Sequence, residues 1–155
     1  MAKECSVSQA IDAPPSVVWA MVTDLPRMGE WSPEAAGGEW LGGATGPALG
    51  AKFKGRNKNG KKSWSTMSKV TTFDVERTFA FDASSVGMKI ARWTYSIEPT
   101  ASGCVVTETW TDQRNAILPL LGKIVSGVAD REEHNRYGMT TTLANLAAAA
   151  VAAPR

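Results

Sequence analysis

The sequence predicts an α+β fold in which a curved antiparallel sheet packs against a long C-terminal helix. Two observations support this prediction. The middle of the chain holds two pairs of runs in which apolar and polar residues alternate around short turn segments, as in β-hairpins. From residue 117 to 146 the apolar residues instead recur at helical spacing. Strands followed by a covering helix are typical of the α+β class.

The first third of the chain predicts one strand and two short helices. Residues 7–11 alternate between apolar and polar side chains, which indicates a strand. A helix is expected over 15–23, beginning at Pro15, because proline is tolerated in the first helical turn. A second short helix is expected over 26–31. It must end before Pro33, since the residue preceding a proline avoids helical geometry.

A short strand over 39–41 precedes a predicted hairpin with strands at 51–57 and 62–72. The Asn59-Gly60 pair favours a type I′ turn, and a turn centred there places Phe53 opposite Thr66. Lys52, Lys54 and Arg56 share one face of the hairpin, which must be the outer one. The inward set is then Phe53, Gly55, Asn57, Trp64 and Thr66.

A strand over 79–81 and a second hairpin, over 89–98 and 104–112, complete the predicted sheet. A four-residue loop from Pro99 to Ser102 would place Trp93 opposite Glu108. The face rich in threonine and arginine is expected to meet solvent. The inward set of this hairpin is Ala91, Trp93, Tyr95, Ile97, Cys104, Val106, Glu108 and Trp110.

The remainder of the chain predicts the long C-terminal helix. Its apolar positions are Ile117, Leu120, Leu121, Ile124, Val125, Val128, Met139, Leu143 and Leu146. Residues 147–155 are almost all alanine and valine, and we expect them to form a frayed helix end.

Composition indicates one domain over 1–155 and excludes several kinds of site. A chain of 155 residues buries roughly 70% of its unfolded surface, enough for a core without metal or disulfide support. Two cysteines provide no disulfide scaffold, and a single histidine excludes any site that needs two imidazoles. A net charge of +2 does not favour a nucleic-acid partner.

The sequence predicts a cytoplasmic protein without stable membrane insertion. Residues 1–5 do not resemble a signal peptide, because charged residues precede any apolar run. The longest apolar stretch, 143–153, is interrupted by Asn145 and is shorter than the roughly 20 residues that span a bilayer. No pattern indicates an oligomeric state.

Glu108 is the residue most suggestive of chemistry. Its predicted inward orientation places a carboxylate beside Trp93 and Trp110, and burial of that kind raises the pKa of a carboxyl group. One interpretation is a ligand-binding group or a general acid and base, with Tyr95 as its companion. The other is a structural ion pair, for example with Arg131 on the facing helix. The residues alone leave both open.

The inward aromatic residues form either a solid core or the wall of a pocket. Aromatic stripes are usually core, but this one has Asn57, Thr66, Ser68 and Glu108 as inward neighbours. A cavity with apolar walls accommodates such polar groups better than a solid core does. The sequence therefore favours a pocket.

Two charged segments have an ordinary interpretation and a functional one. The hairpin over 52–62 is basic, which protects a sheet edge from aggregation or provides a contact with a membrane or an anionic partner. His134 lies in the charged run 131–136 and is interpreted as a solvated helix residue rather than a catalytic one.

Several segments, in their order along the chain, resemble the START-like (SRPBCC, helix-grip) superfamily. Within it, the chain looks like the polyketide cyclase/dehydrase-like group of small stand-alone actinobacterial proteins. The matching segments are Ile11-Asp12-Ala13-Pro14-Pro15 with Val18-Trp19, Trp31-Ser32-Pro33, Phe53 with Gly55-Arg56-Asn57, Arg92-Trp93-Thr94-Tyr95 with Ile97-Glu98-Pro99, and Asn135, Gly138-Met139 and Thr142-Leu143.

The resemblance implies a helix-grip fold: about seven antiparallel strands around a long C-terminal helix, with a ligand cavity between them. It implies binding or carriage of a hydrophobic small molecule, such as a lipid, a polyketide or an aromatic metabolite. The alternative is a polyketide cyclase or dehydratase that uses the same cavity, with Glu108 and Tyr95 as candidate proton-transfer groups. The resemblance provides no catalytic signature, no cofactor and no metal ligand.

The candidate ligand-binding residues combine the inward face of the sheet with the facing helix. They are Phe53, Asn57, Trp64, Thr66, Phe81, Trp93, Tyr95, Val106, Glu108, Trp110, Asn135 and Met139.

Overall fold

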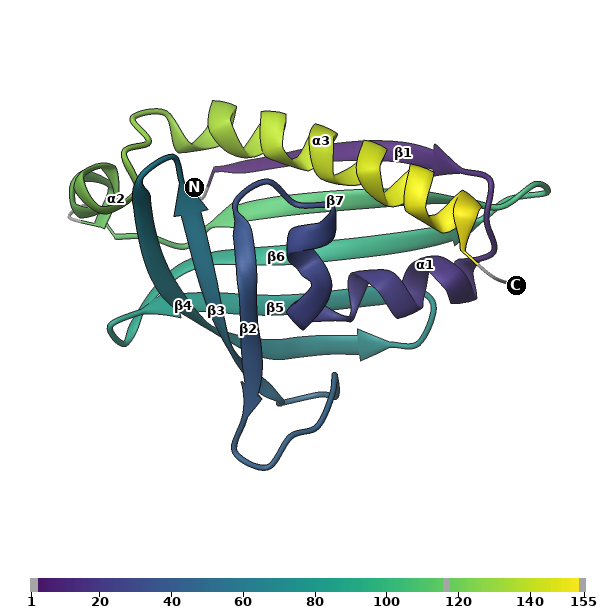
Figure 1. The fold of residues 1–155 in the computed structure, drawn as a ribbon, viewed down its shortest axis with the longest axis horizontal. Coiled ribbons are helices and arrows are strands. Elements are labelled where there is room, and N and C mark those ends of the chain that lie inside the picture. Colours follow the sequence, from purple (N-terminus) through teal and green to yellow (C-terminus); the bar gives the residue numbers. More distant parts are fainter. Residues whose placement is uncertain (1–2, 116–117, 154–155) are drawn as a thin grey trace.

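The computed structural model describes residues 3–115 and 118–153 and confirms the α+β helix-grip prediction (Figure 1). Two short helices follow the first strand, as expected, and the strands form one antiparallel sheet in the order β1-β7-β6-β5-β4-β3-β2. The elements are β1 (Glu4–Ile11), α1 (Pro15–Val22), the 3-10 helix η1 (Leu25–Glu30), β2 (Ala35–Leu41), β3 (Lys52–Asn59), β4 (Lys62–Asp74), β5 (Thr78–Ser85), β6 (Met88–Pro99), β7 (Cys104–Asp112), α2 (Leu118–Ser126) and α3 (Arg131–Ala152).

The sheet is strongly curved, and α3 lies along its concave side. In Figure 1, the direction of β2 and β3 makes a steep angle with that of β6 and β7. The helix α3 lies above β6 and β7, beside β1. The first strand and the last strand are neighbours in the sheet, because β1 pairs antiparallel with β7 from Glu4↔Thr111 to Ile11↔Cys104. The curvature leaves space between the sheet and the helix that side chains must fill or leave open.

The predicted turn of the first hairpin is displaced by one residue. The two-residue loop is Gly60-Lys61, and Asn59 pairs with Lys62 across it. Only Gly60 of these two has a positive φ, at 60°, as in a type II′ turn rather than the expected type I′. Phe53 therefore lies opposite Ser68, not Thr66. Moving the turn by one residue shifts the pairing of the strands by two positions. Such a shift preserves the face on which each side chain lies.

The second hairpin shows the same kind of error. Its loop is Thr100–Gly103, because Pro99 pairs with Cys104. Glu108 consequently lies opposite Tyr95, and Trp93 lies opposite Trp110, rather than in the predicted pairing of Trp93 with Glu108. The faces are again unchanged.

The long C-terminal helix is divided into α2 and α3. Gly127, with φ of 73°, adopts a left-handed conformation just after α2, and Asp130 then caps α3 by accepting a hydrogen bond from the Glu133 amide at 3.1 Å. Ile117, predicted to belong to this helix, lies outside the described residues, as do 154 and 155. Residues 147–152 are helical, and Ala150 is fully buried.

The main hydrophobic core occupies the half of the molecule around α1 and the C-terminal half of α3. Val18 and Val22 of α1 pack there with Phe79, Leu143 and Leu146, all fully buried. No helix among residues 3–115 and 118–153 is long and apolar enough to cross a membrane. The packed half fixes the position of α3, whose first half faces a cavity.

Candidate functional site

A cavity of about 860 Å³ lies between the inner face of the sheet and the first half of α3. Strands β3 to β7, the helix α2 and the residues around η1 complete its wall. The helix α3 contributes Asn135, Met139 and Thr142 to the cavity, whereas Leu143 and Leu146 of the same helix belong to the core. One helix thus serves the solid half of the molecule and the hollow half.

The structure places eleven of the twelve candidate ligand-binding residues along this cavity. The exception is Val106, which is fully buried in the hydrophobic core and does not line the cavity. The eleven are Phe53, Asn57, Trp64, Thr66, Phe81, Trp93, Tyr95, Glu108, Trp110, Asn135 and Met139.

Glu108 and Tyr95 form the polar centre of the cavity wall. They lie directly opposite each other on β7 and β6, and the Tyr95 hydroxyl donates a hydrogen bond of 2.8 Å to Glu108 Oε1. Glu108 is only 4% exposed. Its second oxygen, Oε2, is buried and has no hydrogen-bond partner among the described residues. The carboxyl group therefore has one oxygen that is held and one that is unsatisfied.

Burial determines the protonation of this pair. It raises the pKa of Glu108 from the usual 4.5 to about 8, although the hydrogen bond from Tyr95 acts in the opposite direction. Burial, followed by the charge of Glu108, raises the pKa of Tyr95 well above its usual value of 10. At neutral pH the site therefore holds a mostly neutral carboxyl group next to a neutral phenol. A neutral carboxyl group donates one hydrogen bond, which an ionised one cannot do.

Arg131 does not form the ion pair with Glu108 that was one of the two interpretations left open by the sequence. The Arg131 guanidinium instead donates from Nη1 to both carboxylate oxygens of Glu34, at 2.9 and 3.0 Å, and from Nη2 to the Ser126 hydroxyl at 2.6 Å. It also lies over the ring of Trp64, 5.8 Å from its centroid. Arg131 is therefore already neutralised and positioned without Glu108.

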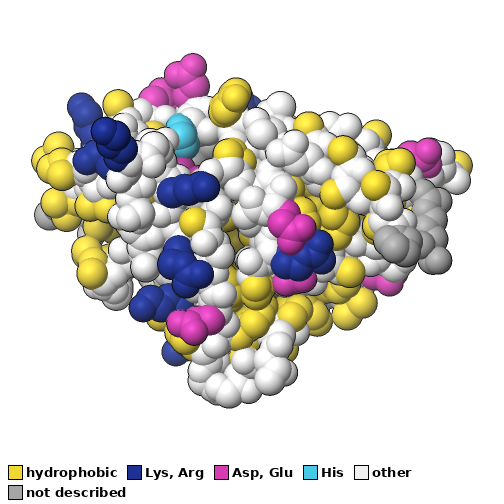
Figure 2. Space-filling model, in the orientation of Figure 1, with side chains coloured by type: hydrophobic (Ala, Val, Ile, Leu, Met, Phe, Trp, Pro, Cys, Tyr) yellow, Lys and Arg dark blue, Asp and Glu magenta, His cyan; other side chains and the backbone are white. Residues whose placement is uncertain are grey.

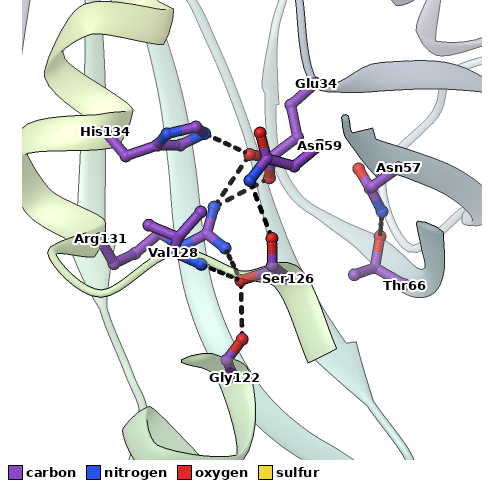
Figure 3. Close-up of polar contacts among 9 residues, drawn as sticks. All are labelled: Glu34, Asn57, Asn59, Thr66, Gly122, Ser126, Val128, Arg131 and His134. Atoms are coloured by element: carbon purple, nitrogen blue, oxygen red, sulfur yellow. Dashed lines mark hydrogen bonds and ion pairs between the residues drawn. The ribbon is translucent and has the colours of Figure 1, made fainter. Parts of the chain in front are cut away.

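His134 joins the same group; it keeps part of the solvent exposure that the sequence predicted and also contacts Glu34. Its Nε2 lies 2.8 Å from Glu34 Oε2, and its side chain is 33% exposed. We call Glu34, Ser126, Arg131 and His134 the Glu34 cluster; Figure 3 shows them converging from the loop before β2 and from both C-terminal helices. All four line the cavity.

Sequence reasoning missed Glu34 and Ser126 as site residues. Arg131 and His134 are three residues apart on a helix, which is a signal that they share a face. Nothing local indicated Glu34, which lies 97 residues from Arg131 and 100 from His134 in the chain.

The first hairpin is attached to α2 beside this cluster. Asn59 donates to the Ser126 carbonyl at 2.9 Å, and the Lys62 ammonium donates to the Ile124 carbonyl at 3.0 Å. Asn57 donates to the Thr66 hydroxyl at 3.1 Å on the cavity wall (Figure 3). The hydrogen bonds from Asn59 and Lys62 satisfy two carbonyl groups in the last turn of α2, where carbonyl groups lack partners within the helix.

A curved seven-stranded sheet around a terminal helix, with a cavity between them, defines the helix-grip class of the SRPBCC superfamily. Residues 3–151 match the sequence profile of the family described as "Polyketide cyclase / dehydrase and lipid transport". The chain belongs to this family, as the resemblance in its sequence implied. No curated protein matches the chain significantly.

Solved structures share the fold. The Polyketide_cyc-like protein Cgl2372 from Corynebacterium glutamicum is 29% identical, with a TM-score of 0.62 over 95% of this chain and 90% of that one. The di-domain ARO/CYC StfQ of the steffimycin biosynthetic pathway is 12% identical, with a TM-score of 0.71 over 96% of this chain and half (50%) of that one. Ara h 8.0201 is 16% identical, with a TM-score of 0.68 over 99% of this chain and all (100%) of that one.

Proposed function

We propose that this protein binds a hydrophobic small molecule with a polar group, such as a lipid, a polyketide or an aromatic metabolite, in the cavity beside α3. The size and lining of the cavity support this proposal, since sites of roughly 300–1,000 Å³ with apolar walls and few polar groups are typical of small-molecule binding. The family description and the similarity to polyketide cyclases agree with it.

The observation that carries the proposal is the unsatisfied oxygen of Glu108. A buried polar atom without a partner is costly, by about 1–3 kcal/mol, unless something outside the chain completes it. Because Tyr95 donates to Oε1, the proton of a neutral carboxyl group would be carried by the buried, unpartnered Oε2 of a residue that lines the cavity. Glu108 would donate that proton in a hydrogen bond to a ligand carbonyl or hydroxyl oxygen.

Affinity would come mainly from apolar contact with the aromatic wall. A ligand that loses roughly 200 Å² of apolar surface to the cavity gains about 5 kcal/mol at 25 cal/mol per Å², before the cost of association. Trp64, Trp93 and Trp110 line the cavity and would provide such contacts. The hydrogen bond from Glu108 would then select molecules with an acceptor at the matching position.

The test measures binding of a hydrophobic fluorescent probe, monitored by tryptophan fluorescence. Native mass spectrometry of the purified protein then shows whether a ligand is bound. Ala83→Trp places a large side chain in the cavity from a buried position on β5 and should abolish probe binding. Ser96→Trp adds the same side chain at an exposed position on β6 and should leave binding unchanged. Equal probe affinity in both variants would exclude the cavity as the binding site.

A second candidate function, catalysis of cyclisation or dehydration, is favoured by the raised pKa of Glu108 beside Tyr95. A neutral Glu108 can protonate a departing hydroxyl group, and the resulting carboxylate can then take a proton from the adjacent carbon. Water leaves, a double bond forms and the carboxyl group is restored. Loss of product with retained binding in Glu108→Gln would favour the enzyme, whereas a co-purified, unaltered ligand would favour the carrier.

A further inference from the structure

One end of the molecule exposes an unusual number of aliphatic side chains. On α2, Leu120 is 66% exposed and Ile124 is 64% exposed, with Leu121 and Val125 also exposed beside them. Val86, in the turn between β5 and β6, is 87% exposed. Figure 2 shows hydrophobic side chains gathered over this end, where Figure 1 places α2. Contiguous exposed apolar groups usually mark an interaction site.

Val86 is exposed at a cost to folding. It adopts a φ of 46°, in the left-handed region that disfavours β-branched residues, and Gly87 follows with a φ of 78°. Such a conformation costs about 1–3 kcal/mol. Asparagine or glycine would adopt this conformation at a lower cost. Valine therefore gives the turn no conformational advantage over either residue. The turn itself therefore does not require an aliphatic side chain at its tip.

These side chains surround one end of the cavity. Val86 from the β5–β6 turn and Leu121 and Val125 from α2 all line it. In Figure 1 this turn, α2 and the β3–β4 turn lie at the same end of the molecule, and α3 extends from there toward the opposite end. We call this surface, formed by α2 and the β3–β4 and β5–β6 turns, the docking end.

The docking end is also basic. Lys58, Lys61 and Lys62 belong to the hairpin formed by β3 and β4, and Lys123 belongs to α2; all four are exposed. The ammonium group of Lys62 donates to the carbonyl of Ile124, which joins the basic hairpin directly to the apolar helix. Carboxylates are present at the start of α3, where Asp130 caps the helix and Glu132 pairs with Lys3 and Arg136.

We infer that the docking end binds reversibly to an anionic lipid surface. The exposed aliphatic side chains would enter the boundary between headgroups and acyl chains, and the lysines would meet the phosphate groups. An acidic protein would complement the lysines but would also need an apolar patch that matches the exposed aliphatic groups. A bilayer with anionic lipids satisfies both. The inference concerns the surface of the protein and holds whichever molecule occupies the cavity.

Flotation of the full chain with phosphatidylcholine vesicles, with and without phosphatidylserine, tests this inference. Binding is expected only with phosphatidylserine and should weaken at high salt. The double variant Leu120→Ser with Ile124→Ser should bind at least about tenfold more weakly. Lys61→Gln and Lys123→Gln should each weaken binding about fivefold. All of these positions are exposed, and circular dichroism and thermal melting will verify folding.

Matched controls lie away from the docking end. Val151→Ser removes an exposed aliphatic side chain near the end of α3, and Lys52→Gln removes an exposed lysine at the start of β3; both should bind vesicles as the parent does. Absence of vesicle binding, or equal loss in the controls, overturns the inference. So does sedimentation that shows a dimer dissociated by Ile124→Ser, because a second copy would then cover this surface.

Discussion

Replacing Glu108 with glutamine should remove a pH-dependent loss of stability. Glu108 is buried, and its pKa in the folded protein is about 8 against a usual value of 4.5. Between these values the folded protein retains a proton that the unfolded chain has already released. Stability from this group is therefore complete below about pH 4.5 and decreases as the pH rises through the folded pKa.

The magnitude follows from the width of this window. Each pH unit within it lowers the free energy of unfolding by about 1.4 kcal/mol, so the whole interval from 4.5 to about 8 corresponds to about 5 kcal/mol. Glutamine stays neutral throughout and can still accept the hydrogen bond from Tyr95. The Glu108→Gln variant should therefore match the parent near pH 4.5 and exceed its stability by several kcal/mol in mildly alkaline solution.

Urea unfolding followed by tryptophan fluorescence at a series of pH values provides the assay. The difference between variant and parent cancels the titration of all other groups. Tyr95→Phe should move the window to higher pH, because it removes the hydrogen bond that lowers the pKa of Glu108. Glu98→Gln, at an exposed position on β6, is the control and should not alter the curve. A difference between Glu108→Gln and the parent that is constant with pH would refute the reasoning.

Three further predictions concern packing, the Glu34 cluster and backbone strain. Gly103→Ala should lower the free energy of unfolding by about 3 kcal/mol, because a Cβ atom there would collide with the Ile11 carbonyl oxygen. Glu34→Ala should cost about 2 kcal/mol, because it leaves the guanidinium of Arg131 partly buried without its carboxylate. Val86→Asn should raise the free energy of unfolding by about 1 kcal/mol, since asparagine tolerates a positive φ. Chemical denaturation measures all three.

Each of these predictions has its own control. Gly46→Ala should be nearly neutral, because no atom of the described residues lies within 4 Å of the added Cβ atom. Arg131→Met alone and combined with Glu34→Ala completes a double-mutant cycle, and additive losses would show that the two side chains are not coupled. Glu76→Asn relieves a second non-glycine residue with positive φ, at 62°, and should also stabilise. Destabilisation by Val86→Asn would contradict the assignment of strain.

The sequence predicted the inner face of the sheet better than its pairing. Alternation fixes which side chains share a face, and this survives any register shift of two residues. Glu108 therefore lines the cavity as predicted, although its partner across the strands is Tyr95 and not Trp93. The predicted register depended on the turn residues alone. Gly60 is compatible with both type I′ and type II′ turns, so it did not determine where the turn lies.

The Glu34 cluster could not be predicted from local patterns. Its members come from a loop and two helices that only the completed fold brings together. The single-helix prediction for the C-terminal third also concealed it, because the break at Gly127 reorients the chain so that Ser126 and Arg131 meet. Apolar spacing continued across the break, and neither segment alone indicated where the helix would end.

The division of α3 between a packed half and a hollow half has an evolutionary consequence. Leu143 and Leu146 pack in the main core, whereas most of the α3 side chains that line the cavity lie nearer the start of the helix. Tyr137, which lines the cavity and is 72% exposed, can be exchanged with less penalty than the fully buried Leu143. Substitutions at such exposed positions can alter the cavity wall while the packed half keeps the fold stable.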